Sequence, residues 1–296
     1  MKFLYSNASS MFNADIVIIG LPDESKSNAK RKGASEGPDG IRMASNEYEY
    51  FERDGKVIRI CPMAGDLYNK KIFDFGNINR DDLYRLVYDI SLADKIPIVL
   101  GGDHSITTLS LKAIHDSIGN VNLLYFDAHP DFVTSTRDYY GSVLSDSAEC
   151  INFDKSLLIG TRAAEPEEIK NVGENKLEIV TPLDILENSV SSIAQKITSR
   201  CGTKSNVYLS LDLDCIDPGI APGVSVPAAG GLSSLEVIFL VKKVCQDLNL
   251  VGLDIVELTP AFDLNNNTAN IAARILMEAI ASMKIKRDLE KPRHNK

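Results

Sequence analysis

The sequence contains no tryptophan, only four histidines and no run of 18 consecutive apolar residues. The missing apolar run argues against a transmembrane helix, and the first 12 residues lack the uninterrupted apolar core of a signal peptide. Ser/Gly-rich linkers, low-complexity tracts and internal repeats are also absent. We therefore expect one domain, residues 1–296, with a frayed charged tail at 286–296 and no membrane partner.

Cysteine content and charge narrow the class of protein further. The five cysteines are odd in number and lack the spacing of a metal site, so we expect reduced, mostly buried thiols and a cytoplasmic location. The formal net charge of -9 makes nucleic acid a poor partner and favours a cationic substrate.

Short apolar runs rich in β-branched and aromatic residues alternate with segments of helical periodicity. The runs predict strands at 97–102, 121–127 and 207–214. Helices are predicted at 81–95, 106–119, 191–200, 233–248 and 268–284. This alternation indicates a parallel sheet that is buried on both faces and flanked by helices.

Acidic residues and two of the four histidines follow these strands. The motifs are GGDHS at 101–105, DAHPD at 127–131 and SLDLDCIDP at 210–218. Because ligands gather at the carboxyl ends of parallel strands, we expect the three motifs to meet. Side chains two apart on a strand share a face, so Asp212 and Asp214 are expected to point the same way. The same holds within DAHPD if the extended conformation persists past the strand.

Together the motifs offer two imidazoles and four carboxylates, from His104, Asp127, His129, Asp131, Asp212 and Asp214. This set suits Mn²⁺ or another divalent ion that prefers oxygen. An Asp pair at a strand end can instead form a turn or a helix cap. A cluster of carboxylates repels itself, however, unless a cation neutralises it. We therefore predict a metal centre, and expect His115 and His294 to be ordinary surface residues.

The motifs, extended to SLDLDCIDPGIAPGVSVPAAGGLS (210–233) and joined by DIVELTPAFD (254–263), resemble the signature blocks of the ureohydrolase family. That family contains arginases, agmatinases and formimidoylglutamases. Weaker similarity at 13–22, 32–42 and 157–168 extends the match across most of the chain. The resemblance implies a three-layer α/β/α sandwich with a mainly parallel central sheet. It also implies two bridged Mn²⁺ ions per chain and a homo-oligomer, either trimer or hexamer.

The resemblance also implies residue roles. By motif position, the six residues named above hold the two ions: His104, Asp127, Asp131 and Asp212 bind one or both, and His129 and Asp214 complete the pair. A guanidinium carbon is poorly electrophilic, and a water that bridges two divalent ions loses a proton easily and can attack it. Glu257 matches the family's carboxylate that accepts hydrogen bonds from the guanidinium. The alternative for Glu257 is an acid at a strand-to-loop boundary.

The loop after DAHPD departs from the family pattern. Many agmatinase-like members have Tyr-x-Gly-x-x-x-Ser-His there, with a histidine that relays protons to the leaving amine. This chain reads YYGSVLSDS at 139–147, which puts Asp146 at the histidine position. In another register Tyr140 and Gly141 replace a His-Gly pair. A carboxylic acid with a raised pKa can relay protons, so Asp146 is a candidate catalytic residue. The alternatives are that it turns the loop, or that the protein is a non-catalytic metal-binding homologue.

The same loop bears on the substrate. It lacks the SGNxHGMP block with which arginases hold the carboxylate and amine of the amino acid, so a small cationic guanidino compound is expected, agmatine before arginine. Hydrolysis of agmatine releases putrescine and urea. Arg137 would favour an acidic tail, as in guanidinobutyrate or formimidoylglutamate, if it faced the pocket; a solvated position is the alternative that its polar surroundings favour.

Overall fold

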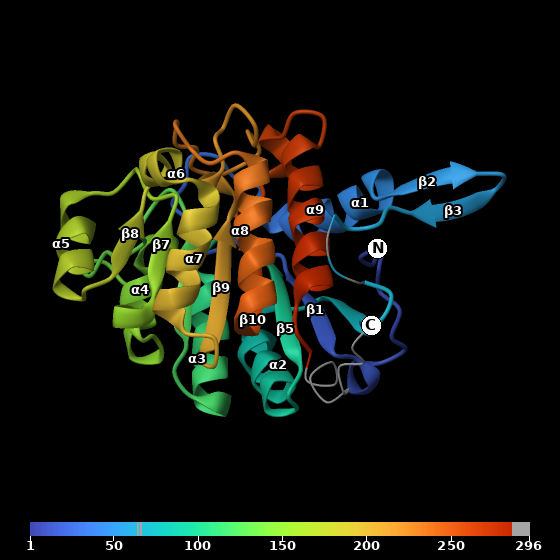
Figure 1. Ribbon diagram of the computed structural model, residues 1–296, viewed down its shortest axis with the longest axis horizontal. Coiled ribbons are helices and arrows are strands. Elements are labelled where there is room, and N and C mark those ends of the chain that lie inside the picture. The colour runs from blue at the N-terminus through green and yellow to red at the C-terminus, as the bar shows by residue number, and fades with distance from the viewer. Residues whose placement is uncertain (64, 66, 286–296) are drawn as a thin grey trace.

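The computed structural model describes residues 1–63, 65 and 67–285, so the predicted tail at 286–296 lies outside the described residues (Figure 1). Its centre is an eight-stranded sheet in the order β4-β1-β5-β10-β9-β6-β7-β8, with parallel neighbours throughout. The strands are β1 (Ile16–Leu21), β4 (Ile72–Asn77), β5 (Ile96–Gly101), β6 (Asn122–Phe126), β7 (Leu157–Ile159), β8 (Glu178–Val180), β9 (Asn206–Asp212) and β10 (Asn249–Val256).

Helices cover both faces of this sheet, which gives three layers (Figure 1). One face carries α1 (Gly37–Tyr48), α6 (Pro182–Asn188), α7 (Val190–Cys201), α8 (Ser234–Asp247) and α9 (Asn267–Ser282). The other carries α2 (Arg80–Leu92), α3 (Ile106–Ile118), α4 (Val143–Asp146) and α5 (Pro166–Glu174). Short 3-10 turns are η1 (Met11–Asn13), η2 (Ala34–Glu36), η3 (Tyr140–Ser142), η4 (Ala148–Cys150), η5 (Phe153–Lys155), η6 (Leu213–Cys215) and η7 (Pro260–Phe262). The predicted α/β/α sandwich is therefore confirmed.

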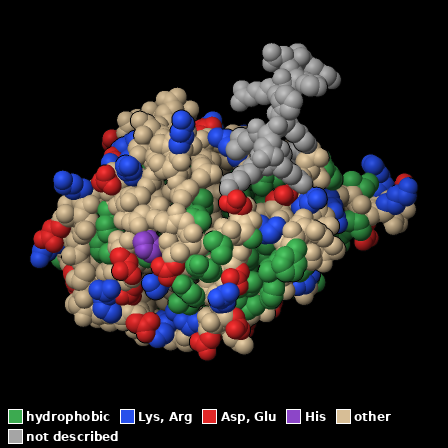
Figure 2. Space-filling model, turned by 90° about the horizontal axis from the view of Figure 1, so that it is seen from below, with side chains coloured by type: hydrophobic (Ala, Val, Ile, Leu, Met, Phe, Trp, Pro, Cys, Tyr) green, Lys and Arg blue, Asp and Glu red, His purple; other side chains and the backbone are tan. Residues whose placement is uncertain are grey.

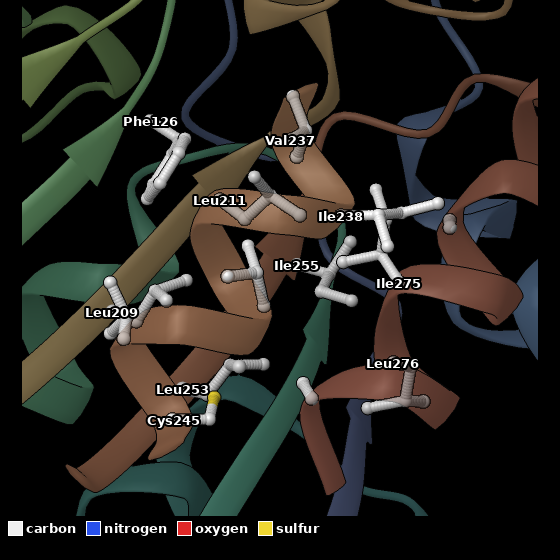
Figure 3. Close-up of a cluster of buried hydrophobic side chains, with 14 of the residues drawn as sticks. Phe126, Leu209, Leu211, Val237, Ile238, Cys245, Leu253, Ile255, Ile275 and Leu276 are labelled. Carbon is white, nitrogen blue, oxygen red and sulfur yellow. The ribbon is translucent and has the colours of Figure 1, made fainter. Parts of the chain in front are cut away.

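The two-residue period of the strands divides their side chains between the two helical layers. Leu209 and Leu211 of β9 pack toward α8 and α9, whereas Tyr208, which precedes Leu209, packs toward α3. Figure 3 shows the part of the core that lies between the sheet and helices α8 and α9, where Cys245 of α8 lies beside Leu253 of β10. Each fully buried Leu or Ile contributes roughly 1.5–3 kcal/mol of transfer free energy. Four of the five cysteines are buried and one is exposed, as the composition predicts, and all are free thiols.

Helix starts follow from local side-chain chemistry. Ser233 precedes α8, and its hydroxyl accepts a hydrogen bond from the N–H of Glu236 at 3.2 Å. The Glu236 carboxylate accepts one from the N–H of Ser233 at 2.8 Å. Such a reciprocal pair satisfies two backbone donors at the helix start, so α8 begins at Ser234.

Two strand ends differ from the prediction. Strand β6 ends at Phe126 and strand β9 ends at Asp212, so Asp214 lies in the η6 turn. The predicted strand at 207–214 is therefore too long by two residues, and the η6 turn rather than strand alternation sets the direction of the Asp214 side chain. The turn residue Asp131 has a positive φ of 49°, so the extended conformation does not persist through DAHPD either.

Outside the sheet, β2 (Tyr50–Arg53) and β3 (Lys56–Arg59) form an antiparallel hairpin that projects from the body of the molecule (Figure 1). Within the described ranges, every helix is too short or too polar to cross a membrane. On the face shown in Figure 2, the Lys and Arg side chains are interspersed with Asp and Glu. That face therefore lacks the continuous basic patch typical of nucleic-acid binding.

Candidate metal centre and active site

The loop between β5 and α3 carries His104. A Cβ atom at Gly102 would collide with the carbonyl oxygen of Asp23, so glycine is required where the two segments touch. The carboxylate of Asp103 accepts hydrogen bonds from the backbone N–H groups of Ser105 and Lys26, both at 3.0 Å. These contacts fix the turn into α3 and leave His104 fully buried at the carboxyl edge of the sheet.

The first group of potential metal ligands surrounds Nδ1 of His104. This nitrogen lies 3.0 Å from Oδ2 of Asp127, 3.3 Å from Oδ2 of Asp131 and 3.3 Å from Oδ2 of Asp212. The hydroxyl of Tyr125 donates a 2.6 Å hydrogen bond to Asp131 and so holds this carboxylate in place.

The second group surrounds His129. Its Nδ1 lies 3.0 Å from Oδ2 of Asp214 and 3.4 Å from Oδ1 of Asp127. Asp127 therefore belongs to both groups, and within each group the potential ligand atoms of three residues lie within 4.8 Å of one another. Two overlapping sites that share one carboxylate are the arrangement that a pair of bridged metal ions needs.

Backbone turns, rather than strand alternation, bring these residues together. The N–H of Asp214 donates to the carboxylate of Asp212 at 2.7 Å, and the N–H of His129 donates to that of Asp127 at 2.6 Å. The N–H of Ala128 reaches across to Asp214 at 3.0 Å and ties the two loops together. Each loop thus uses its own aspartates to shape the turn that presents them.

The electrostatics of the cluster show strong mutual repulsion between its acids. Burial, with the charges of Asp131 and Asp214, raises the pKa of Asp127 to about 6. Burial and neighbouring carboxylates raise the pKa of Asp212 well above its usual range. Burial lowers the pKa of His129, but its contacts with Asp127 and Asp214 outweigh this and raise it to about 12. The site therefore favours cations.

A pocket of about 250 Å³ opens onto the cluster. Its described lining comprises Asp127, His129, Asp131, Val133, Tyr139, Tyr140, Gly141, Ala163, Glu165, Glu168, Asp212, Asp214, Val226 and Glu257. Lysine and arginine are absent from this described lining, which makes the pocket strongly acidic.

Glu257 follows β10 with a positive φ of 66°. Its backbone N–H donates to the carbonyl of Gly102 at 2.8 Å, and its Oε1 accepts from the N–H of His104 at 2.9 Å. Its Oε2 is buried without a hydrogen-bond partner in the described parts of the chain. Burial raises the pKa of Glu257 to about 8, although the neighbouring Ser225 hydroxyl acts in the opposite direction.

Asp146 and Arg137 bind each other instead of lining the pocket. The guanidinium of Arg137 donates to the Asp146 carboxylate and to the carbonyl of Ser145. Asp146 also accepts hydrogen bonds from the Ser142 hydroxyl at 2.5 Å and the Asp138 N–H at 2.9 Å. Arg137 thus occupies the solvated position expected of it, and Asp146 has the contacts of a residue that holds the loop.

His115 takes no part in this site. His115 lies on α3, half-buried, with Nε2 4.0 Å from Asp116. His294 lies outside the described residues.

Four residues of the described lining have polar side chains to which the sequence analysis gave no role: Tyr139, Tyr140, Glu165 and Glu168. Glu168 accepts hydrogen bonds from the N–H groups of Phe132 and Glu165, and burial raises its pKa to about 7. Both glutamates follow the short strand β7, where the acid-rich stretch at 165–168 could have drawn attention.

Comparison with known proteins places this geometry in a family. The model of the arginase family matches residues 14–282. An agmatinase of Neisseria meningitidis serogroup C is 31% identical over 288 residues, covering 93% of this chain and 89% of the relative. The solved structure of proclavaminate amidino hydrolase from Streptomyces clavuligerus has a TM-score of 0.84 at 27% identity, covering 95% of this chain and 96% of that one. The agmatine ureohydrolase of Thermoplasma volcanium has a TM-score of 0.81 at 27% identity, covering 98% and 96%.

The family model spans most of the chain, and the two comparisons of structure agree with it over nearly the full length. The His and Asp groups at the strand ends are positioned to bind metal. The chain therefore belongs to the arginase family of metal-dependent amidinohydrolases.

Proposed function

We propose that the protein is a dimanganese amidinohydrolase that hydrolyses agmatine to putrescine and urea. The observation that carries this proposal is the position of Glu257. Its buried carboxylate lines the same pocket as the paired histidine and aspartate groups and keeps one oxygen without a hydrogen bond in the described structure. A buried free acceptor of this kind is suited to a cationic guanidinium.

The donor set fits two divalent ions. Each group offers one imidazole nitrogen with carboxylate oxygens and contains no thiolate, a combination that favours Mn²⁺ over softer metals. Oδ2 of Asp127, the residue common to both groups, is buried without a hydrogen bond in the described structure. A pair of Mn²⁺ ions held by these residues would lower the pKa of a bound water and so supply the nucleophile for the guanidinium carbon.

The protein's own contribution begins with orientation. The His104 N–H holds one oxygen of Glu257, so the carboxylate presents its other oxygen in a fixed direction. A guanidinium bound there is held beside the proposed metal ligands, which lowers the entropic cost of bringing it to the nucleophile. A cation in this place also favours the charged form of Glu257, against the effect of burial.

The rest of the pocket distinguishes between possible tails of the substrate. Glu165 and Glu168 line it, and Arg137 is turned away toward Asp146. The carboxylate of arginine, guanidinobutyrate or formimidoylglutamate would find no cationic partner in the described lining, whereas the ammonium group of agmatine would face two glutamates. This charge pattern supports agmatine.

The amine that departs must receive a proton. Asp146 as its donor stays a prediction, since its carboxylate is engaged by Arg137 and Ser142 outside the described lining of the pocket. Tyr139 and Tyr140 are the hydroxyl-bearing residues of that lining. Burial, with the charges of Asp131 and Glu257, raises the pKa of Tyr140, so its hydroxyl stays protonated and can donate at neutral pH.

Urea release decides between the substrates. Purified protein with added Mn²⁺ should release urea from agmatine with a kcat/KM at least about tenfold above those for arginine and guanidinobutyrate, since one unpaired charge in a pocket costs at least about 1.4 kcal/mol. A preference for guanidinobutyrate or arginine would overturn the assignment of substrate. Two bound Mn²⁺ ions without urea from any of the three would favour the non-catalytic alternative.

Assembly and location are further proposals. Family membership supports a homo-oligomer, which we expect to be a trimer or hexamer by light scattering of the eluted protein. The cytoplasmic location rests on the free cysteines and stays a prediction.

A further inference from the structure

A buried polar network lies behind His104, on the side away from the metal groups. Nε2 of His104 is 2.8 Å from the hydroxyl of Ser210, and that hydroxyl donates a 2.6 Å hydrogen bond to Oδ1 of Asp254. Oδ2 of Asp254 accepts two further hydrogen bonds, from Tyr208 at 2.7 Å and Thr107 at 2.8 Å. All five side chains are almost completely buried, so water does not compete for these contacts.

The polarity of this network follows from the number of protons that each group holds. A serine hydroxyl carries one proton, and Ser210 directs it to the acceptor Asp254. The oxygen of Ser210 is then left as an acceptor toward His104, so Nε2 must carry the ring proton. The other ring nitrogen, Nδ1, faces the carboxylates of the metal centre and is the nitrogen that a metal would bind.

We propose that Asp254 is a positioning residue that acts through Ser210 to hold His104 in the tautomer that can bind metal. The proposal rests on the metal centre described above and adds a determinant of its affinity that lies outside it. The imidazole that binds a metal through one nitrogen is oriented by the hydrogen bond at the other. Here a serine stands between the imidazole and the anion.

The asymmetry of the contacts makes Asp254→Asn a sharp test. Oδ2 receives two hydroxyl protons and Oδ1 receives one. An asparagine will therefore keep its carbonyl oxygen toward Tyr208 and Thr107 and turn its NH₂ group toward Ser210. Ser210 must then accept from the amide and donate to His104, which moves the ring proton to Nδ1 and blocks the metal-binding nitrogen.

Three variants separate this role from a purely structural one. Asp254→Asn and Ser210→Ala should each raise the dissociation constant for Mn²⁺ by about 10- to 100-fold, the usual effect of losing a partner of a metal-binding histidine. The control Tyr208→Phe removes one hydrogen bond to Asp254 but preserves the polarity, so its dissociation constant should change by less than about threefold. Melting temperatures of the chelator-treated proteins show whether each variant is folded.

A double variant tests whether the effect passes through the serine. In a Ser210→Ala background, Asp254→Asn should cause no further loss of Mn²⁺ affinity, because the connection is already cut. A structural role for Asp254 predicts additive losses instead, and additivity would overturn the proposal.

The wild-type protein offers a test that does not depend on variants. In protein labelled with ¹⁵N-histidine and loaded with diamagnetic Zn²⁺, the His104 ring should show a proton on Nε2, assigned by its change in Ser210→Ala. A proton on Nδ1, or an unchanged Mn²⁺ dissociation constant in Asp254→Asn, would refute the role of Asp254. A wild-type protein that binds no metal would instead refute the metal centre itself, so the two failures are distinct.

Discussion

The carboxylate of Glu257 accepts a 2.9 Å hydrogen bond from the backbone N–H of His104. The residue proposed to bind the guanidinium is thereby tied to the loop that carries a proposed metal ligand. Substrate position and metal position are consequently set by the same contact. This coupling makes the two functions separable only by substitutions that preserve the accepting oxygen.

Glu257→Gln is such a substitution, because the amide oxygen can still accept from His104. We expect the metals and the melting temperature to be retained while kcat/KM for agmatine falls by roughly 10²-fold, the scale of losing a charged hydrogen bond to a cation. Steady-state kinetics with metal analysis measures both. An unchanged kcat/KM would place Glu257 outside the substrate site.

Metal binding should depend on the predicted ligands and on pH. We expect about two Mn²⁺ ions per chain, as two-metal hydrolytic sites require, and loss of at least one in Asp212→Ala or His129→Ala. In the metal-free site the pKa of His129 is raised to about 12 and that of Asp127 to about 6, so His129 holds a proton that a metal must displace and Asp127 gains one as the pH falls toward 6. The Mn²⁺ dissociation constant should therefore rise as pH falls from 8 to 6. Titration with Mn²⁺ at several pH values checks this. A protein that binds no metal in excess Mn²⁺ would contradict both the metal centre and the proposed function.

The features that the sequence predicts well are those encoded locally. A run such as 121–127 carries its own strand signal, and the acid at its end, Asp127, has to lie at the carboxyl edge of the sheet because parallel strands end together. The six candidate ligands follow β5, β6 and β9; β9 lies beside β6, and β10 alone separates β9 from β5, so the three strand ends lie close together.

The features that the sequence does not predict depend on packing between segments. Asp214 reaches the cluster from a 3-10 turn, which strand periodicity cannot anticipate. The partners of Asp146 come from a loop conformation in which Arg137 folds back over it. The network around Asp254 is hidden for a similar reason, since a single acid within an apolar strand shows no partner until Ser210 and Thr107 are placed beside it.

Substrate preference should shift when the acidic wall of the pocket is altered. Glu165 is exposed at the pocket, so Glu165→Gln should raise KM for agmatine about fivefold, near the upper value for a solvent-exposed ion pair. The KM for guanidinobutyrate should not rise, because its tail gains nothing from the glutamate. Equal effects on both substrates would show that Glu165 does not distinguish their tails.

A buried ion pair under α1 should dominate the stability of that region. Arg42 and Asp74 are both almost fully buried, and the Arg42 guanidinium donates to the carboxylate through two nitrogens at 2.9 Å each. Asp74→Asn should lower the free energy of unfolding by about 3 kcal/mol, because it leaves the buried guanidinium with only Asp39, an exposed carboxylate 3.4 Å away, as its counter-ion.

The chain contains a matched control for this pair. Arg85 and Asp89 are also joined at 2.9 Å, but their side chains are 75% and 39% exposed. Asp89→Asn should therefore change the free energy of unfolding little. Denaturant titrations of both variants give the comparison, and equal losses would show that burial does not set the strength of these pairs.

The group that delivers a proton to the departing amine can be identified by substitution of Asp146. If Asp146 delivers a proton to the departing amine, Asp146→Asn should lower kcat by roughly 10² or more with little change in KM. The contacts of its carboxylate with Arg137 and Ser142 favour the other outcome. We therefore expect kcat in Asp146→Asn to stay within about threefold of the wild type, since an asparagine keeps one acceptor oxygen for the loop.

Tyr140 supplies the contrasting variant, because its side chain lines the pocket and its raised pKa keeps the hydroxyl protonated at neutral pH. Tyr140→Phe removes only that hydroxyl and should lower kcat about tenfold, the scale of one hydrogen bond of about 1.4 kcal/mol. Comparing kcat and its pH profile in the two variants assigns the role. A large loss of kcat in Asp146→Asn together with an unchanged kcat in Tyr140→Phe would show that Asp146 is the proton donor. The loop would then have to rearrange around Arg137 to bring that carboxyl group to the substrate.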